Sequence, residues 1–144
     1  MITKKLSLFL IALIMPFALM SCSDDSTGID DIEEDPIGTT FKVNMAEVEG
    51  FDPDSDQVYI TGSHIEWPEP GTEPNQQLME PEEDDSMIYV IFYEGLENGE
   101  YEFKFFSTAI GEGWDSGEWP GDPNRSVTVQ GETEYEGVFG VQPE

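Results

Sequence analysis

Apolar and polar residues alternate along several short segments that follow residue 38. In residues 39–45 the side chains of Phe41, Val43 and Met45 recur at every second position. A period of two is typical of a strand with one buried face. The longest apolar run, residues 87–93, indicates a central strand. On these patterns we expect about seven strands, at residues 39–45, 57–61, 77–79, 87–93, 100–106, 126–129 and 135–139.

The segments between these strands are rich in glycine, proline and acidic residues, and no segment has a convincing helical period. Residues 94–99 end in Asn98-Gly99, a pair that favours a tight hairpin turn. Residues 68–86 hold four prolines and predict a long loop around the short strand at 77–79. The pattern therefore predicts an all-β fold, a single antiparallel, immunoglobulin-like β-sandwich spanning residues 39–144.

The first 21 residues have the pattern of an export signal. Lys4 and Lys5 precede a largely apolar run, residues 6–19, which is too short to span a bilayer comfortably. Leu-Met-Ser-Cys at residues 19–22 ends this run and resembles the lipobox of bacterial lipoproteins. The resemblance implies that the signal peptide, residues 1–21, is removed and that Cys22 becomes the lipidated first residue. An ordinary signal peptide with an incidental cysteine is the alternative.

Cys22 is the only cysteine, so the chain cannot form an intramolecular disulfide. Residues 22–38 are acidic and lack any periodicity, which predicts a disordered tether. Its Ser-Asp-Asp at residues 23–25 resembles the acidic export tag of Bacteroidota lipoproteins, although a plain acidic linker would look the same. We therefore expect an outer-membrane protein that is anchored by lipid at Cys22 and exposed at the cell surface.

The charge of the chain excludes several classes of partner. After Cys22 three basic residues, Lys42, Lys104 and Arg125, stand against all 32 acidic residues, a formal net charge of −29. No basic patch can form, so nucleic acid is excluded as a partner. Binding to anionic lipid by charge alone is excluded for the same reason.

Residues 119–125, Trp-Pro-Gly-Asp-Pro-Asn-Arg, place a tryptophan beside a stiff turn. An exposed indole offers a flat apolar face, and the amide of Asn124 offers both a donor and an acceptor, a combination that suits a sugar. Strand alternation places Lys104 on the face opposite Phe103 and Phe105, so we expect its ammonium to point outward, toward the same site.

These features occur in the order found in starch-binding domains, the family-20 carbohydrate-binding modules and their glycogen-binding relatives. The chain resembles them in residues 58–63, Trp67, residues 101–105, Trp119 and the Asp-Pro-Asn-Arg of residues 122–125. The resemblance implies a sugar site made of Trp67, Lys104, Trp119 and Asn124, with Trp114 as a candidate additional platform. The loop before Trp67 is shorter than in typical starch-binding domains, and no counterpart of their second sugar site is visible.

Each of these residues also has a plainer interpretation. Trp67 and Trp119 could be rim residues that cap the sandwich core, and Lys104 could be a charge partner for the surrounding acid. Arg125 is expected to be structural and to pin its turn to a nearby carboxylate. The acidic residues 80–85 supply oxygen ligands that suit Ca²⁺, but they lack the glycine spacing of a dedicated loop, so we expect a solvated face and no metal site.

Two functions are open at this point. A surface lipoprotein of this kind would bind an α-glucan (starch, glycogen or maltooligosaccharide) without catalysis, for a partner glycan-degrading enzyme or transporter. Alternatively, the sandwich is a structural or protein-interaction module of a secreted or outer-membrane assembly, with its tryptophans covered by protein. The chain has one histidine, His64, to which we assign no role, and no nucleophile or cofactor motif, so we expect neither an enzyme nor a cofactor.

Overall fold

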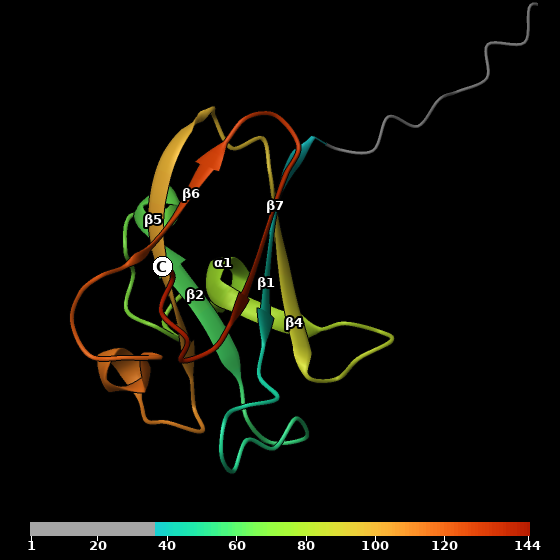
Figure 1. The fold of residues 1–144 in the computed structure, drawn as a ribbon, viewed down its shortest axis with the longest axis vertical. Helices are drawn as coiled ribbons and strands as arrows, with labels where there is room; N and C mark the ends of the chain where they lie inside the picture. Colours follow the sequence, from blue (N-terminus) through green and yellow to red (C-terminus); the bar gives the residue numbers. More distant parts are fainter. Residues whose placement is uncertain (1–36) are drawn as a thin grey trace, which may run out of the picture. The chain divides into compact units, whose positions relative to one another are not determined.

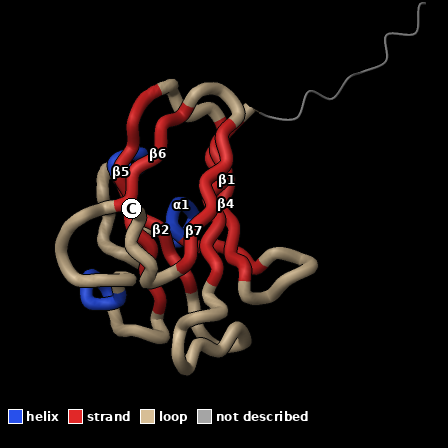
Figure 2. The backbone as a smooth tube through the Cα atoms, viewed as in Figure 1, coloured by secondary structure: helices blue, strands red, loops and turns tan. Residues whose placement is uncertain are grey.

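A computed structural model describes residues 37–144; the expected signal peptide, Cys22 and most of the tether lie outside these residues. Its seven strands are β1 (Gly38–Asn44), β2 (Val58–Gly62), β3 (Leu78–Pro81), β4 (Ile88–Glu94), β5 (Gly99–Ser107), β6 (Arg125–Val129) and β7 (Thr133–Val138). The helical parts are short (Figure 2): α1 (Pro74–Gln77) and the 3-10 turns η1 (Ser63–Ile65) and η2 (Gly113–Ser116). None of the helices described is long and apolar enough to cross a membrane.

The strands form two layers that share one short strand. One layer consists of β7, β1 and β4, the other consists of β6, β5 and β2, and β3 pairs with both β2 and β4. Figure 1 shows the two layers facing each other. Five of the six pairings are antiparallel, whereas β1 and β7 are parallel. The predicted all-β sandwich of about seven strands is therefore confirmed, with one parallel pair at its edge.

The turn between β4 and β5 does not close a hairpin, so this part of the sequence interpretation is wrong. β4 pairs with β1 and β3, whereas β5 pairs with β2 and β6. The chain therefore crosses from one layer to the other between Glu94 and Gly99. Asn98 Oδ1 accepts a hydrogen bond from the backbone N–H of Gly131 at 2.9 Å, which joins this crossing to the turn after β6. The apolar faces of β4 and β5 pack across the core instead of their edges pairing.

The core lies between the layers and uses the alternating positions that the sequence predicts. Phe41 and Val43 of β1 and the adjacent Met45 are fully buried, as are Phe103 and Phe105 of β5. Phe41 meets Phe103 edge-on, with ring centroids 4.8 Å apart. Burying such a side chain contributes about 1.5–3 kcal/mol of hydrophobic free energy. These two strands therefore hold the layers together.

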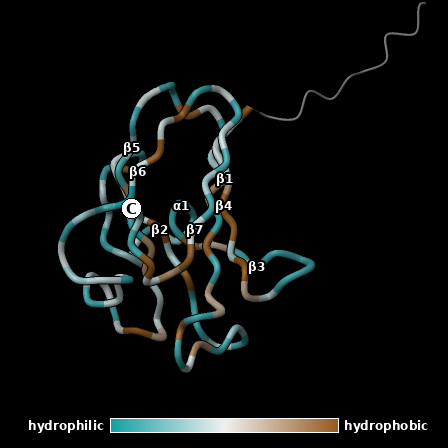
Figure 3. Tube along the Cα trace, viewed as in Figure 1, coloured by the Kyte–Doolittle hydropathy of each residue, from teal (hydrophilic) through white to brown (hydrophobic). Residues whose placement is uncertain are grey.

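The connection between β2 and β4 also differs from the expected plain loop. α1 begins at Pro74, which loses no helical hydrogen bond at that position, and the chain runs from α1 directly into β3. β3 confirms the short strand expected at residues 77–79, but it begins one residue later and ends two residues later. The acidic turn between β3 and β4 is hydrophilic and largely exposed (Figure 3). Within residues 37–144 no cluster of three or more possible metal ligands is found.

Residues 37–144 lie within one compact unit. Every described strand pairing and every described core residue lies between Gly38 and Phe139. Residues 23–144 contain all of this described core, so experiments on them are expected to report on the folded domain.

Candidate functional site

A pocket of about 240 Å³ lies on the side of β5 that faces away from the core. It is lined by Trp67, Lys104, Trp114, Trp119 and Asn124, together with Phe106, Gly117, Pro120, Gly121 and Asp122. The first five are the candidate residues of the sequence analysis. They come from four separate stretches of the chain, and the fold brings all of them to one place.

Trp67 lies in a strained loop at the end of β2. After η1 both Glu66 and Trp67 adopt the left-handed conformation, with φ of 63° and 55°. For residues other than glycine this conformation costs roughly 1–2 kcal/mol each, because Cβ crowds the following carbonyl oxygen. The N–H of Trp67 donates to the carbonyl of Gly62 at 3.0 Å, so the loop doubles back on the strand. Strained residues cluster at functional sites, and here the strained residue is one wall of the pocket.

Buried polar side chains hold the segment that follows this loop. The carbonyl oxygen of Pro68 accepts from Thr61 Oγ1 at 2.8 Å and from Gln77 Nε2 at 3.0 Å. Gln77 Nε2 also donates to the carbonyl of Glu69 at 3.2 Å, and its Oε1 accepts from the N–H of Glu73 at 3.0 Å. Gln77 is fully buried. Sequence reasoning missed this residue because a single glutamine in a polar stretch has no pattern that distinguishes it.

His64 packs under the same loop, although the sequence analysis assigns it no role. Its ring stacks on Phe41 with centroids 5.3 Å apart and meets Tyr93 edge-on at 4.6 Å. Neither ring nitrogen finds a hydrogen-bond partner in the described part of the chain. Burial favours the neutral imidazole and lowers the pKa of His64 from 6.5 to about 4. The neutral ring therefore acts as a packing group beneath the loop that carries Trp67.

We expect the protein to lose stability through His64 as the pH falls below 6.5. The unfolded chain takes up the proton near pH 6.5, whereas the folded chain takes it up only near pH 4. The unfolded state binds more protons in this window, so its free energy falls relative to the folded state by up to about 3 kcal/mol at pH 4. Urea unfolding of wild type and His64→Phe at pH 7 and pH 4.5 checks this. The variant should lose less on acidification, and equal losses would contradict the assignment.

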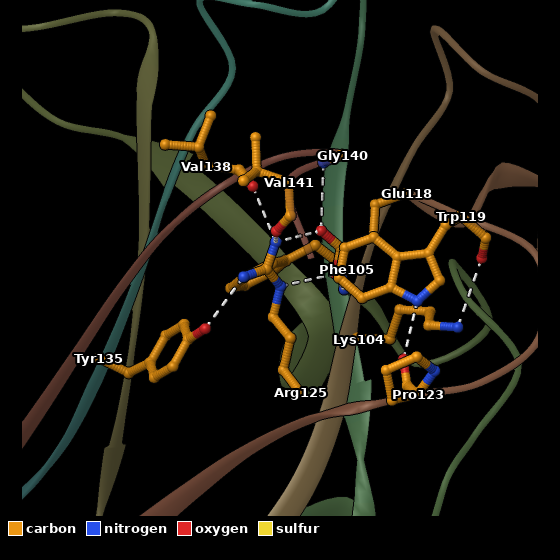
Figure 4. Close-up of polar contacts among 10 residues, drawn as sticks. All are labelled: Lys104, Phe105, Glu118, Trp119, Pro123, Arg125, Tyr135, Val138, Gly140 and Val141. Atoms are coloured by element: carbon orange, nitrogen blue, oxygen red, sulfur yellow. Dashed lines mark hydrogen bonds and ion pairs between the residues drawn. The ribbon is translucent and has the colours of Figure 1, made fainter. Parts of the chain in front are cut away.

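Trp119 is far more buried than the sequence analysis expects, with 9% of its surface exposed. Its indole N–H donates to the carbonyl of Pro123 at 2.8 Å, within its own turn. The Arg125 guanidinium lies 4.9 Å from the ring centroid, and the Lys104 ammonium lies 5.4 Å from it (Figure 4). The expectation of an exposed indole at this position is therefore wrong, because two cations and the turn cover most of the ring.

Lys104 is also buried, with 6% of its surface exposed. Strand alternation correctly places it on the outer side of β5, but the loop that carries Trp119 folds over it. The ammonium donates to the carbonyl oxygens of Trp119, at 3.4 Å, and Gly121. No carboxylate of residues 37–144 lies within ion-pair distance of it, so the structure does not support its interpretation as a charge partner. An ammonium has three protons, which leaves one for a ligand in the pocket.

Replacing Lys104 by Met should lower the free energy of unfolding by about 1–3 kcal/mol, because hydrogen bonds from charged groups are stronger than neutral ones. Methionine keeps the apolar stem and removes the bonds to the loop. Urea unfolding measures the change. Lys42→Met is the matched control, since Lys42 forms ion pairs with Glu82 at 3.1 Å and Glu134 at 3.3 Å at the surface. Such pairs contribute little, so equal losses in both variants would contradict the prediction.

The two remaining candidates are more open to solvent. Asn124 is half-buried and lines the pocket, where its amide can both donate and accept. Trp114, in η2, is 51% exposed, and its ring meets Phe106 edge-on with centroids 5.9 Å apart. The pocket therefore combines an exposed indole, a neutral amide and one ammonium.

Arg125 and Glu118 form a buried ion pair behind the pocket (Figure 4). Nε and Nη2 of Arg125 donate to the two carboxylate oxygens at 2.8 and 2.6 Å, and both side chains are almost fully buried. The guanidinium also donates to the carbonyls of Val138 and Val141 and to the hydroxyl of Tyr135. Burial alone would lower the pKa of Arg125, but the hydrogen bonds and charge of Glu118 raise it. This geometry matches the structural role expected for Arg125.

No protein-family model matches the chain, and no curated protein matches it. Among solved structures, the chain is similar to a glycoside hydrolase family 15 glucoamylase from Hypocrea jecorina, with a TM-score of 0.48 and 15% sequence identity. The match covers 73% of this chain and 17% of the glucoamylase chain. The chain thus spans about a sixth of that enzyme, and at this distance the similarity says nothing about activity.

Proposed function

We propose that this protein binds a neutral α-glucan, such as starch, glycogen or a maltooligosaccharide, without acting on it. The observation that carries the proposal is the convergence of three tryptophans, one lysine and one asparagine on a single pocket. Indole rings pack against the apolar C–H faces of sugars and remove that area from water. The ammonium and the amide supply hydrogen bonds for the hydroxyl groups around the ring. The shared order of motifs with starch-binding domains directs the proposal to α-glucans.

Charge favours a neutral ligand over an acidic one. The chain has 32 acidic residues and five basic ones. Of the residues that line the pocket, Lys104 is the one cation, and the exposed Asp122 opposes it. Arg125 lies behind the pocket with its charge neutralised by Glu118. A uronic acid or a sulfated glycan would approach against this negative field, whereas the hydroxyl groups of a neutral glucan would not.

Isothermal titration of residues 23–144 with β-cyclodextrin or maltoheptaose tests the proposal. We expect saturable binding, and the absence of any heat at millimolar ligand would overturn it. An acidic oligosaccharide of similar length should not bind. Phe92→Ala is the matched control for aromatic variants of the pocket, because Phe92 is 43% exposed but lies on β4, in the other layer. Its loss should leave the affinity unchanged.

Tryptophan fluorescence separates glycan binding from a protein-interaction module. Trp114 is exposed enough for acrylamide to quench it. A glucan bound in the pocket should protect this indole, so the quenching constant should fall when maltoheptaose is added. Quenching that ignores the sugar would favour the interaction module.

We further propose that lipid on Cys22 anchors the protein in the outer membrane, with the domain at the cell surface, where it would hold glucan for an enzyme or transporter. The support is the lipobox-like sequence at residues 19–22 and the acidic residues 23–25, which lie outside the described residues. Metabolic labelling with palmitate and membrane fractionation of wild type and Cys22→Ala test the anchor. Wild type should be labelled and sediment with membranes, and an unlabelled wild type would contradict the anchor.

A further inference from the structure

The tryptophans of the pocket differ in what they can offer to a ligand. Trp119 is 9% exposed, whereas Trp114 is 51% exposed. Lys104 and Arg125 lie against the ring of Trp119, and its N–H is used within its own turn. Trp119 therefore offers only a small part of its ring to a sugar. Trp114 offers more, because about half of its surface is open to solvent beside its T-shaped contact with Phe106.

Trp114 is held in place although it is exposed. Ser116 Oγ donates to the carbonyl of Gly113 at 2.6 Å, across the turn that carries the indole. Gly113 has φ of 53°, and a Cβ atom there would lie 2.6 Å from a carboxylate oxygen of Glu69. The turn is thus packed against the segment that follows Trp67. An aromatic ring that is already held loses less conformational freedom when a ligand stacks on it.

The pocket has room for one sugar ring and not for several. Its volume of about 240 Å³ is below the ~300–1,000 Å³ of pockets that enclose drug-sized ligands. A glucan longer than one ring must therefore extend beyond the pocket. Of the tryptophans that line the pocket, Trp114 is the most exposed, so its indole is the one best available to a ring outside the pocket.

We propose that Trp114 is the stacking platform for the second sugar ring of the ligand, adjacent to the ring that occupies the pocket. This inference rests on the proposed α-glucan function and assigns the part of the site that responds to ligand length. A second ring that buries about 55 Å² of apolar surface on the indole gains roughly tenfold in affinity. Removing the indole should abolish this gain, so that a disaccharide and a monosaccharide bind with equal affinity.

The test is an NMR titration of residues 23–144 with methyl α-D-glucopyranoside and with maltose, for wild type, Trp114→Ala and Trp114→Phe. Wild type should bind maltose about tenfold more tightly than the monosaccharide. Trp114→Ala should bind the two sugars equally, and Trp114→Phe should recover most of the difference. The spectrum of each free variant reports whether it is folded.

Two results overturn the inference while glucan binding stands. In one, Trp114→Ala keeps the wild-type ratio between the two affinities; in the other, wild type itself binds both sugars equally. If wild type binds neither maltose nor β-cyclodextrin, the proposed function fails and the inference fails with it. The two failures are therefore distinguishable in one set of titrations.

Discussion

Replacing Glu118 by Ala is expected to lower the free energy of unfolding by about 3–5 kcal/mol, because it leaves a buried charge without a partner. Arg125 is 2% exposed, and its guanidinium would stay buried without a counter-charge. The backbone N–H groups of Phe105 and Gly140 would also lose their carboxylate acceptor, at 3.1 and 3.3 Å. A domain of this kind is typically stable by about 5–15 kcal/mol, so the variant should be near the limit of folding. Urea unfolding followed by tryptophan fluorescence measures the loss.

The double variant Glu118→Leu, Arg125→Met is the matched control for this prediction. Replacing both members of a buried ion pair removes the unpaired charge, and such replacements often cost little or even stabilise. We therefore expect the double variant to be more stable than Glu118→Ala. A loss of less than about 1 kcal/mol in Glu118→Ala would place it among ordinary substitutions and would contradict the assigned importance of the pair.

The same ion pair connects the core to the pocket. Glu118 immediately precedes Trp119, and Arg125 immediately follows Asn124. The pair therefore clamps both ends of the loop that covers Lys104, and the guanidinium fixes this loop to the carbonyls of Val138, at the end of β7, and Val141. Loop position and fold stability are thus coupled, so a folded Glu118 variant should also bind glucan more weakly than wild type.

The positions of strands such as β1 and β5 could be predicted from the sequence because apolar residues recur on the face that packs on the core. Alternation over residues 100–106 corresponds to β5, and alternation over residues 39–45 corresponds to β1. The resemblance to starch-binding domains also points to residues that meet at one pocket. A tryptophan followed at fixed spacing by Asp-Pro-Asn-Arg carries local information, and all five candidate residues line one pocket.

The pairing partners of each strand, and the loop that buries Lys104, could not be predicted in the same way. Alternation shows which face is buried but not which edge pairs, so Asn98-Gly99 indicates a hairpin where the chain crosses between layers. The burial of Lys104 depends on a loop fifteen to seventeen residues away along the chain, whose carbonyls it meets. The left-handed backbone conformation of Trp67 could not be predicted from the sequence, because a bulky residue such as tryptophan rarely adopts this conformation.

Replacing Trp67 by Ala is expected to weaken the binding of maltoheptaose at least tenfold, or about 1.4 kcal/mol. The indole forms one wall of the pocket, and its removal exposes the ligand ring to water on that side. Isothermal titration measures the change, with Phe92→Ala as the exposed aromatic control in the other layer. Affinity equal to that of wild type would show that the ligand does not contact this wall.

Trp67→Gly is the matched variant for Trp67→Ala. Both lack the indole, so we expect them to bind maltoheptaose equally weakly but to differ in the free energy of unfolding. At an unstrained position alanine is more stable than glycine by about 0.4–1 kcal/mol, since glycine makes the unfolded chain more flexible. At φ of 55° alanine keeps the left-handed strain, which costs roughly 1–2 kcal/mol and which glycine relieves. Trp67→Gly should therefore match or exceed Trp67→Ala in urea unfolding. If Trp67→Ala is the more stable variant, the loop relaxes once the indole is gone. If Trp67→Gly is the more stable variant, the fold itself imposes the strained conformation that places Trp67 at the pocket.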